Sequence, residues 1–177
     1  WSVVRGVGAG CAGGRAGAVA RGWGGGGWAG GVLACAVDVG RLAAGEEDMI
    51  RERAGAAGAV ETEIIDARDE IALRFLVPAV RANAMYEGKY PLVSALSRPV
   101  ITEHLVASAR RHGADAVAHG CTGKGNDQVR FEVSSRVLAP DLDVMAPVRV
   151  GGPTRAGGIQ PADKWETPRS PSKEKRY

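Results

Sequence analysis

Short apolar runs alternate with helix-like segments from Val32 onward, and this alternation constrains the fold more than any other feature of the chain. The run "VLACAVDVG" ends in Asp38 and Gly40, as a buried strand that enters a loop does. Further strands are predicted at 59–67, 116–118 and 142–148. Strands that alternate with helices form a parallel sheet covered by helices on both faces, with ligands beyond the C-terminal ends of the strands. The predicted fold class is therefore α/β and Rossmann-like.

Four segments between these strands have the composition of helices. Residues 45–58 supply acids for a first turn and Gly58 as a stop. Residues 68–86 continue a helical pattern that Pro78 should kink or divide. Residues 99–112 place Pro99 near the first turn and Gly113 at the C-cap, and 126–133 form a helix after the glycine-rich loop.

Composition divides the chain into three zones. Half of its 26 glycines lie in residues 1–31, which contain no acidic residue, so disorder is the default expectation there and order is predicted to begin near Val32. Residues 32–150 carry the α/β pattern, and 151–177 are rich in proline, glycine and charge, which predicts a poorly ordered tail.

The bulk properties disfavour several classes of partner. The formal charge is only +3 and basic residues are interspersed with acids, which argues against nucleic acid. No apolar run approaches the roughly 18 residues of a membrane span, and glycines stand where a signal peptide needs an apolar core. Three scattered cysteines match neither a disulfide framework nor a metal site. We expect a soluble, cytoplasmic protein.

The stretch "HGCTGKGNDQVRFE", residues 119–132, is the strongest candidate for a binding site. It lies between a predicted strand and a predicted helix, where backbone N–H groups favour anions, and Lys124 adds a charge. Its spacing is not that of a Walker A loop, and on spacing alone a plain glycine turn explains it equally well. Four groups that could recognise an amino acid favour binding: Thr122, Asn126, Asp127 and Arg130.

Other residues keep two interpretations. His119 could approach a phosphate or be a hydrogen-bonded structural histidine, and Arg98 could fix a substrate carboxylate or cap a turn. Met85, Tyr86 and Phe75 are expected in the core, His104 and His112 on helix surfaces, and Cys121 as a space-filler without a base beside it.

The stretch "KYPLVSALSRPVITEHLVASARRHGADAVAHGCTGKGNDQVRFE", residues 89–132, closely resembles argininosuccinate synthase, and the likeness extends from about Val32 to Arg149. The resemblance implies the adenine nucleotide alpha hydrolase type of Rossmann-like fold. It also implies a carbon–nitrogen ligase that joins citrulline to aspartate through a citrullyl-adenylate, releasing AMP and pyrophosphate. Family members use ATP with Mg, form cytoplasmic homotetramers, and serve arginine biosynthesis and the urea cycle.

The resemblance also assigns roles to individual residues. Tyr90 and Arg130 would hold citrulline, Asn126 would touch both amino acids, and Thr122 and Asp127 would take aspartate, with Asp127 on its ammonium group. Gly120 would lie against the nucleotide. Lys124 is our own addition, as a contact for a carboxylate or phosphate. No side chain is required as a catalytic nucleophile, because the enzyme has to align its ligands and stabilise charge.

Both ends of the chain depart from the family pattern. The family's pyrophosphate loop "SGGLDTS" aligns with "AGGRAGA" at 12–18, which keeps Gly13 and Gly14 but loses the hydroxyls and the carboxylate. The segment 162–177 disrupts the family sequence, and the family's synthetase domain would follow it. Two hypotheses result: an argininosuccinate synthase domain that is inactive as this fragment, or a non-catalytic amino-acid-binding or decayed copy of the enzyme.

Overall fold

The computed structural model describes five parts of the chain, namely residues 2–4, 31–43, 45–56, 59–121 and 125–146. Most of the predicted glycine-rich segment, and the predicted boundary with the tail at 150–151, lie outside these residues. No helix in the described part of the chain is long and apolar enough to cross a membrane.

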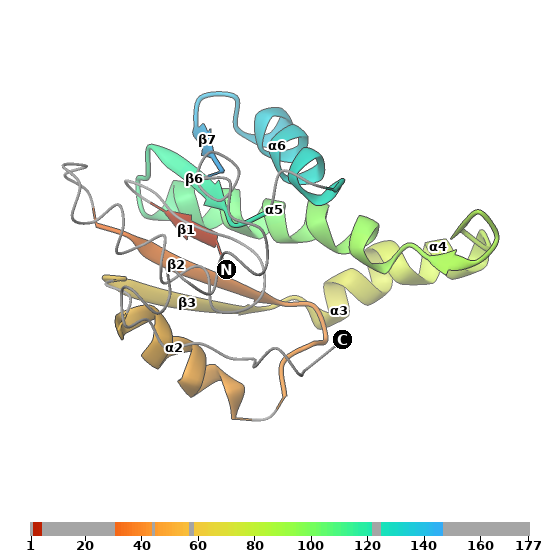
Figure 1. Ribbon diagram of the computed structural model, residues 1–177, viewed down its shortest axis with the longest axis horizontal. Helices are drawn as coiled ribbons and strands as arrows, with labels where there is room; N and C mark the ends of the chain where they lie inside the picture. Colours follow the sequence, from red (N-terminus) through yellow and green to blue (C-terminus); the bar gives the residue numbers. More distant parts are fainter. Residues whose placement is uncertain (1, 5–30, 44, 57–58, 122–124, 147–177) are drawn as a thin grey trace.

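A five-stranded sheet forms the centre of the molecule, in the order β3-β2-β1-β6-β7 (Figure 1). The strands are β1 Ser2–Val4, β2 Leu33–Asp38, β3 Glu61–Asp66, β6 Ala116–His119 and β7 Asp143–Met145. The pairs β2–β3 and β6–β7 are parallel, which confirms the predicted parallel α/β arrangement for these four strands.

Strand β1 is the exception, because it runs antiparallel to both of its neighbours, β2 and β6. The sequence analysis placed the beginning of order near Val32 and did not predict a strand at Ser2–Val4. Two strands that are both antiparallel to a third run parallel to each other, so β2 and β6 point the same way. The C-terminal ends of β2, β3, β6 and β7 consequently lie along one edge of the sheet.

Helices cover both faces of this sheet (Figure 1). Their bounds are α2 Glu46–Ala56, α5 Val93–Arg111 and α6 Asp127–Leu138. Side chains alternate between the faces of a strand. Ala34 packs against Ala54 of α2, whereas Leu33 and Cys35 pack against Leu105 of α5. The helix α2 therefore lies on one face and α5 on the other.

The larger core lies between the sheet and α5. Its buried members are Leu33, Cys35, Leu105, Val106, Ala109, Ala114, Val117, Ala139 and Leu142. Ile101, Leu105 and Ala109 lie on one side of α5, and Leu105 and Ala109 are fully buried while Ile101 is half-buried. This core fixes α5 against the strands whose ends form the candidate site.

The helix α5 begins earlier than predicted, because it starts at Val93 and contains Pro99 in its interior. Proline has no N–H group and removes one helical hydrogen bond. The burial of Ser97, Val100 and Thr102 around it shows that packing of this turn outweighs that loss. The predicted C-cap is confirmed: Gly113 has a φ of 61°, and the N–H of Ala114 donates to the Ala109 carbonyl at 2.9 Å.

An arm projects from the body of the molecule (Figure 1). It consists of α3 Arg68–Ile71, the π-helical segment η1 Ala72–Leu76, α4 Val77–Arg81 and a hairpin of β4 Met85–Tyr86 with β5 Tyr90–Pro91. The irregularity predicted at Pro78 takes the form of the π-helical turns directly before it. The placement of Met85 and Tyr86 in a buried helix was wrong, since both lie in the hairpin and are exposed.

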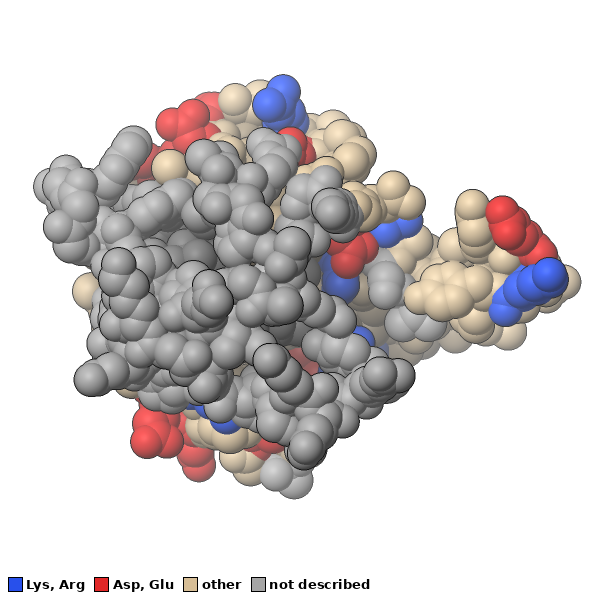
Figure 2. Space-filling model, in the orientation of Figure 1, with Lys and Arg blue, Asp and Glu red and all other residues tan. Residues whose placement is uncertain are grey.

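Charged side chains join the base of the arm to α5. The Nε2 atom of His104 lies 2.6 Å from Glu70 Oε2, and a guanidinium nitrogen of Arg74 lies 2.7 Å from Glu103 Oε2. Acidic and basic side chains of the described residues lie close together on the visible face, including the tip of the arm (Figure 2).

Candidate functional site

The C-terminal edge of the sheet gathers polar residues from three strands. β2 ends at Asp38, β3 ends at Asp66, and β6 ends at His119, which is followed by Gly120. Ligands of open α/β sheets bind beyond this edge, because the loops that follow the strands diverge there.

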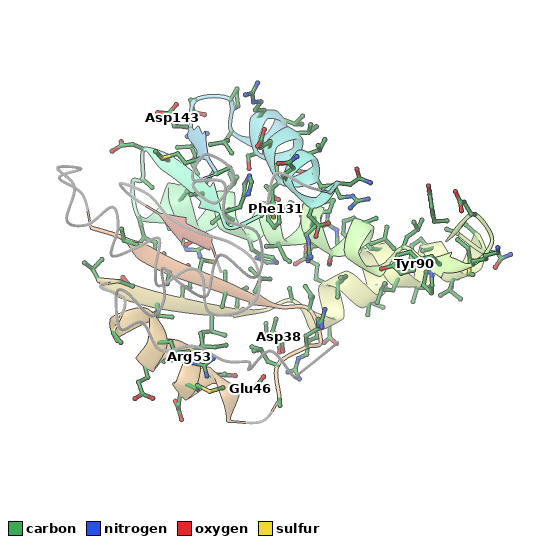
Figure 3. The ribbon with its side chains drawn as sticks, in the orientation of Figure 1. Asp38, Glu46, Arg53, Tyr90, Phe131 and Asp143 are labelled. Atoms are coloured by element: carbon green, nitrogen blue, oxygen red, sulfur yellow. The ribbon has the colours of Figure 1, made fainter. Side chains whose placement is uncertain are left out.

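Asp38 shapes the loop that follows β2. Its side chain is largely buried, and Oδ1 accepts hydrogen bonds from the backbone N–H groups of Gly40 at 2.8 Å, Arg41 at 2.9 Å and Leu42 at 3.2 Å. These hydrogen bonds stabilise the loop after β2, because aspartate side chains commonly accept from backbone N–H groups a few residues later in turns. Figure 3 shows Asp38 at the end of β2, beside the beginning of α3.

Arg68 connects the ends of β2 and β3. Its Nε atom lies 2.9 Å from Asp66 Oδ1 and 3.7 Å from Asp38 Oδ2. Hydrogen bonds from the Arg68 side chain and backbone lower the pKa of Asp66 to about 2, so this exposed carboxylate stays ionised at neutral pH. The sequence analysis did not identify this pair, although both residues lie at a predicted strand end.

His119 is a hydrogen-bonded structural histidine, which was one of the two interpretations of this residue. It is 2% exposed, and its ring stacks on Phe131 of α6 with centroids 5.4 Å apart. Nδ1 accepts a hydrogen bond from the backbone N–H of Cys121 at 3.4 Å, while Nε2 faces Glu132 Oε1 at 3.7 Å. An accepting Nδ1 places the proton on Nε2. The ring thus holds α6 against the end of β6.

The first turn of α6 carries three of the predicted substrate residues. Gly125 precedes it with a φ of 118°, which favours glycine, and Asn126 is the N-cap residue. The Asn126 side chain is exposed and makes no capping hydrogen bond to the end of α6. Asp127 and Arg130 follow on the first turn and are both half-buried.

The carboxylate of Asp127 lies between two arginines. Arg98 of α5 donates to Oδ2 at 2.9 Å, and Arg130 of α6 donates to Oδ1 at 3.0 Å. Arg98 is not a turn cap, because it lies inside α5, and its guanidinium forms an ion pair with Asp127; its interpretation as a substrate carboxylate contact stays a prediction. The sequence contained no signal for this contact, because Arg98 was predicted to precede its helix.

The remaining predicted site residues do not all join this cluster. Gly120 lies directly after β6 and is half-buried. Tyr90 is on the hairpin of the arm, 54% exposed, and well apart from Phe131 of α6 in Figure 3. Gly13, Gly14, Thr122 and Lys124 lie outside the described residues, so their predicted contacts with nucleotide and substrates stay predictions.

Neither cysteine in the described part of the chain is in a nucleophilic setting. Cys35 and Cys121 are both buried. Burial, assisted by the nearby Glu63 carboxylate, raises the pKa of the Cys35 thiol to about 12. Among the described residues there is also no group of three histidine, cysteine or acidic side chains that could hold a metal ion.

A comparison with known protein families identifies the family to which this chain belongs. The model of the argininosuccinate synthase N-terminal HUP domain matches residues 9–168. The chain belongs to the argininosuccinate synthase family. The match confirms the resemblance read from residues 89–132 and the Rossmann-like fold class, since HUP domains have this fold. The match also places the chain in a family of ATP-using, ligase-type enzymes.

Proposed function

We propose that this chain is the nucleotide-binding domain of an argininosuccinate synthase, which ligates citrulline and aspartate at the expense of ATP. The observation that carries the proposal is the position of Asn126, Asp127 and Arg130. They lie at the N-terminal end of α6, which follows β6 after the loop 120–125, and α/β sheets bind their ligands beyond the C-terminal ends of their strands. The family match over residues 9–168 supplies the reaction class.

The proposed chemistry requires three ligands to be held in line. The ureido oxygen of citrulline attacks the α-phosphate of ATP and pyrophosphate leaves; the aspartate amine then attacks the ureido carbon and AMP leaves. In our proposal Asp127 binds the aspartate ammonium and Arg130 binds the citrulline carboxylate by charge-assisted hydrogen bonds. Asn126, whose side chain is exposed, contacts both amino acids, and Thr122 adds a contact with aspartate.

Two further substrate contacts are part of the proposal. Tyr90 is proposed as a citrulline contact, although it lies on the arm apart from α6 in this structure. Lys124 is proposed as a contact for a carboxylate or a phosphate. Arg130 is therefore the residue on which we base citrulline recognition, because it lies beside Asp127.

The residues present fit ATP only in part. Gly120 lets a nucleotide approach the end of β6, and Gly13 and Gly14 supply backbone N–H groups for pyrophosphate. However, Ala12, Ala16, Gly17 and Ala18 stand where the family has polar side chains that would bind pyrophosphate and Mg. We propose that the chain as written binds amino acids but does not adenylate citrulline.

The second candidate function is binding without catalysis, by a decayed copy of the enzyme. The alanines and glycine at positions 12–18 favour it, since they remove the polar groups that ATP cleavage needs. Under the first candidate the product enters arginine biosynthesis and the urea cycle in the cytoplasm, and complete enzymes assemble as homotetramers. Under the second, only the amino-acid site is retained.

An isotope-exchange assay separates the two candidates. Exchange of labelled pyrophosphate into ATP, dependent on citrulline, reports adenylation without needing aspartate. We expect none from the chain as written. The decisive variant restores the polar loop in a chain that also carries the family's synthetase domain, with the changes Ala12→Ser, Arg15→Leu, Ala16→Asp, Gly17→Thr and Ala18→Ser made together. Citrulline-dependent exchange by this variant supports the ligase function. Its absence in that variant, with aspartate still bound, supports the binding function.

A further inference from the structure

The two oxygens of the Asp127 carboxylate are held by arginines of different origin. Oδ2 accepts from Arg98, which belongs to the neighbouring helix α5, at 2.9 Å. Oδ1 accepts from Arg130, three residues along the same helix α6, at 3.0 Å. The cluster combines two positive charges with one negative charge, so Asp127 is fully engaged by cations of the protein itself.

The two arginines are anchored to different degrees. The Arg98 side chain is 19% exposed, and its other terminal nitrogen lies 3.3 Å from the hydroxyl of Ser97, which is buried. Its backbone carbonyl accepts a hydrogen bond from the hydroxyl of Thr102, which is fully buried. Buried residues of α5 therefore hold both the side chain and the backbone of Arg98 in place.

Arg130 lies on a more exposed surface. Its side chain is 32% exposed, and Val133, three residues later in α6, is 56% exposed. A partly exposed pair within one helix contributes little free energy, because water competes for both partners. An incoming cation can thus replace Arg130 on Oδ1 more easily than it can replace Arg98 on Oδ2.

We propose that Asp127 exchanges partners when an amino acid binds: it keeps Arg98 on Oδ2 and gives up Arg130 on Oδ1 to the ammonium group of aspartate. This inference rests on the proposed function, which assigns aspartate to Asp127. Arg98 is then a positioning residue that keeps the carboxylate aimed at the ligand. The released Arg130 guanidinium becomes available to the carboxylate of citrulline, so one exchange prepares both amino-acid contacts.

The exchange is visible in the arginine side chains. The chain is prepared with ¹⁵N-labelled arginine, and the guanidinium Nη–H signals, which belong to the groups that donate to Asp127, are assigned at low temperature with the variants Arg98→Lys and Arg130→Lys, each of which removes the signals of one arginine. We expect aspartate to shift the Arg130 signal toward the position of a solvated arginine and to leave the Arg98 signal unchanged. Arg136, exposed on the same helix, serves as the solvated reference. A shift of Arg98, or an unmoved Arg130 in the presence of bound aspartate, overturns the exchange.

Calorimetry separates this inference from the function on which it rests. We expect Arg98→Gln to weaken aspartate binding about tenfold, Arg98→Lys to restore part of it, and Arg136→Gln to have no effect. Circular dichroism of each variant checks that α6 is still folded, and the labelling experiment on the unaltered chain does not depend on any variant. Aspartate bound by the unaltered chain with an unmoved Arg130 signal overturns the exchange alone, whereas no aspartate binding at all overturns the proposed function with it.

Discussion

Two glycines of this domain should respond to the same substitution with opposite signs. Gly113 follows the C-cap of α5 with a φ of 61°, and Gly55 is the penultimate residue of α2, where the backbone is still helical. A Cβ atom built on either glycine meets no heavy atom within 4 Å. Replacement by alanine therefore introduces no clash at either position, and any change in the free energy of unfolding comes from backbone conformation.

The magnitudes follow from that difference. Alanine in the left-handed region costs about 1–2 kcal/mol, offset by the smaller entropy of its unfolded state, so Gly113→Ala should destabilise by about 1 kcal/mol. Alanine in a helix is favoured over glycine by about 0.5–1 kcal/mol, so Gly55→Ala should stabilise by that amount. The hydrogen bond from Ala114 to Ala109, which closes the end of α5, depends on the Gly113 conformation.

Urea unfolding followed by circular dichroism measures both effects. With a slope of about 2 kcal/mol per molar urea, the two midpoints should move in opposite directions by about 0.3–0.5 M. Destabilisation by both substitutions, or by neither, would refute the reasoning, because the two positions would then not differ in backbone conformation as described.

Three further predictions concern the core and the site. Phe131→Ala should lower the free energy of unfolding by about 3–5 kcal/mol, whereas Val133→Ala, at an exposed position, should change it by less than about 0.5 kcal/mol; comparable losses would contradict the packing of α6. Burial raises the pKa of Glu70, but hydrogen bonds from His104 and Arg74 outweigh it and place the pKa below its usual 4.5. The stabilisation by ionised Glu70 is thus present above pH 4.5 and lost as pH falls through the lower folded-state pKa, so the stability gap to Glu70→Gln should narrow in acid; a constant gap would exclude this pairing. Cys35, with a pKa of about 12, should resist thiol reagents at pH 8 until the domain unfolds, and peptide mapping that finds it labelled in the native state would contradict its burial.

The parts of the fold predicted from the sequence were those in which local pattern and tertiary packing agree. The strand Leu33–Asp38 and the helix Glu46–Ala56 have clear periodicity and clear ends, and both lie where they were expected. The strand Ser2–Val4 has three residues, too few to show alternation, and it exists through pairing with strands far away in the chain. Short strands of this kind have no local signal.

The arm was mispredicted for a different reason. Apart from Pro78, the helical pattern of residues 68–86 continues to Tyr86 in the sequence, but Asn83 and Glu87 adopt positive φ angles of 47° and 53°. The angle at Asn83 ends the helix, and the angle at Glu87 belongs to the hairpin turn. Neither residue type indicates a positive φ in a sequence as strongly as glycine does. Met85 and Tyr86 consequently moved from a predicted core to an exposed strand.

The candidate site was predictable in its location but not in its contacts. The glycine-rich loop between a strand and a helix pointed to the first turn of α6, where Asp127 and Arg130 lie. The ion pair between Arg98 and Asp127 joins residues 29 positions apart, and it depends on how α5 crosses α6. Sequence spacing contains no information on that crossing, so only the three-dimensional structure could supply the pair.

Aspartate binding to this chain tests the central claim most directly. Equilibrium dialysis with labelled aspartate should show saturable binding to the unaltered chain, at least about tenfold weaker binding to Asp127→Asn, and unchanged binding to Asp143→Asn. Asp143 is an exposed acid on β7, away from Phe131 in Figure 3, and so controls for loss of a surface charge. Equal binding by Asp127→Asn and the unaltered chain, or no binding by either, would contradict the assignment of the amino-acid site to the first turn of α6.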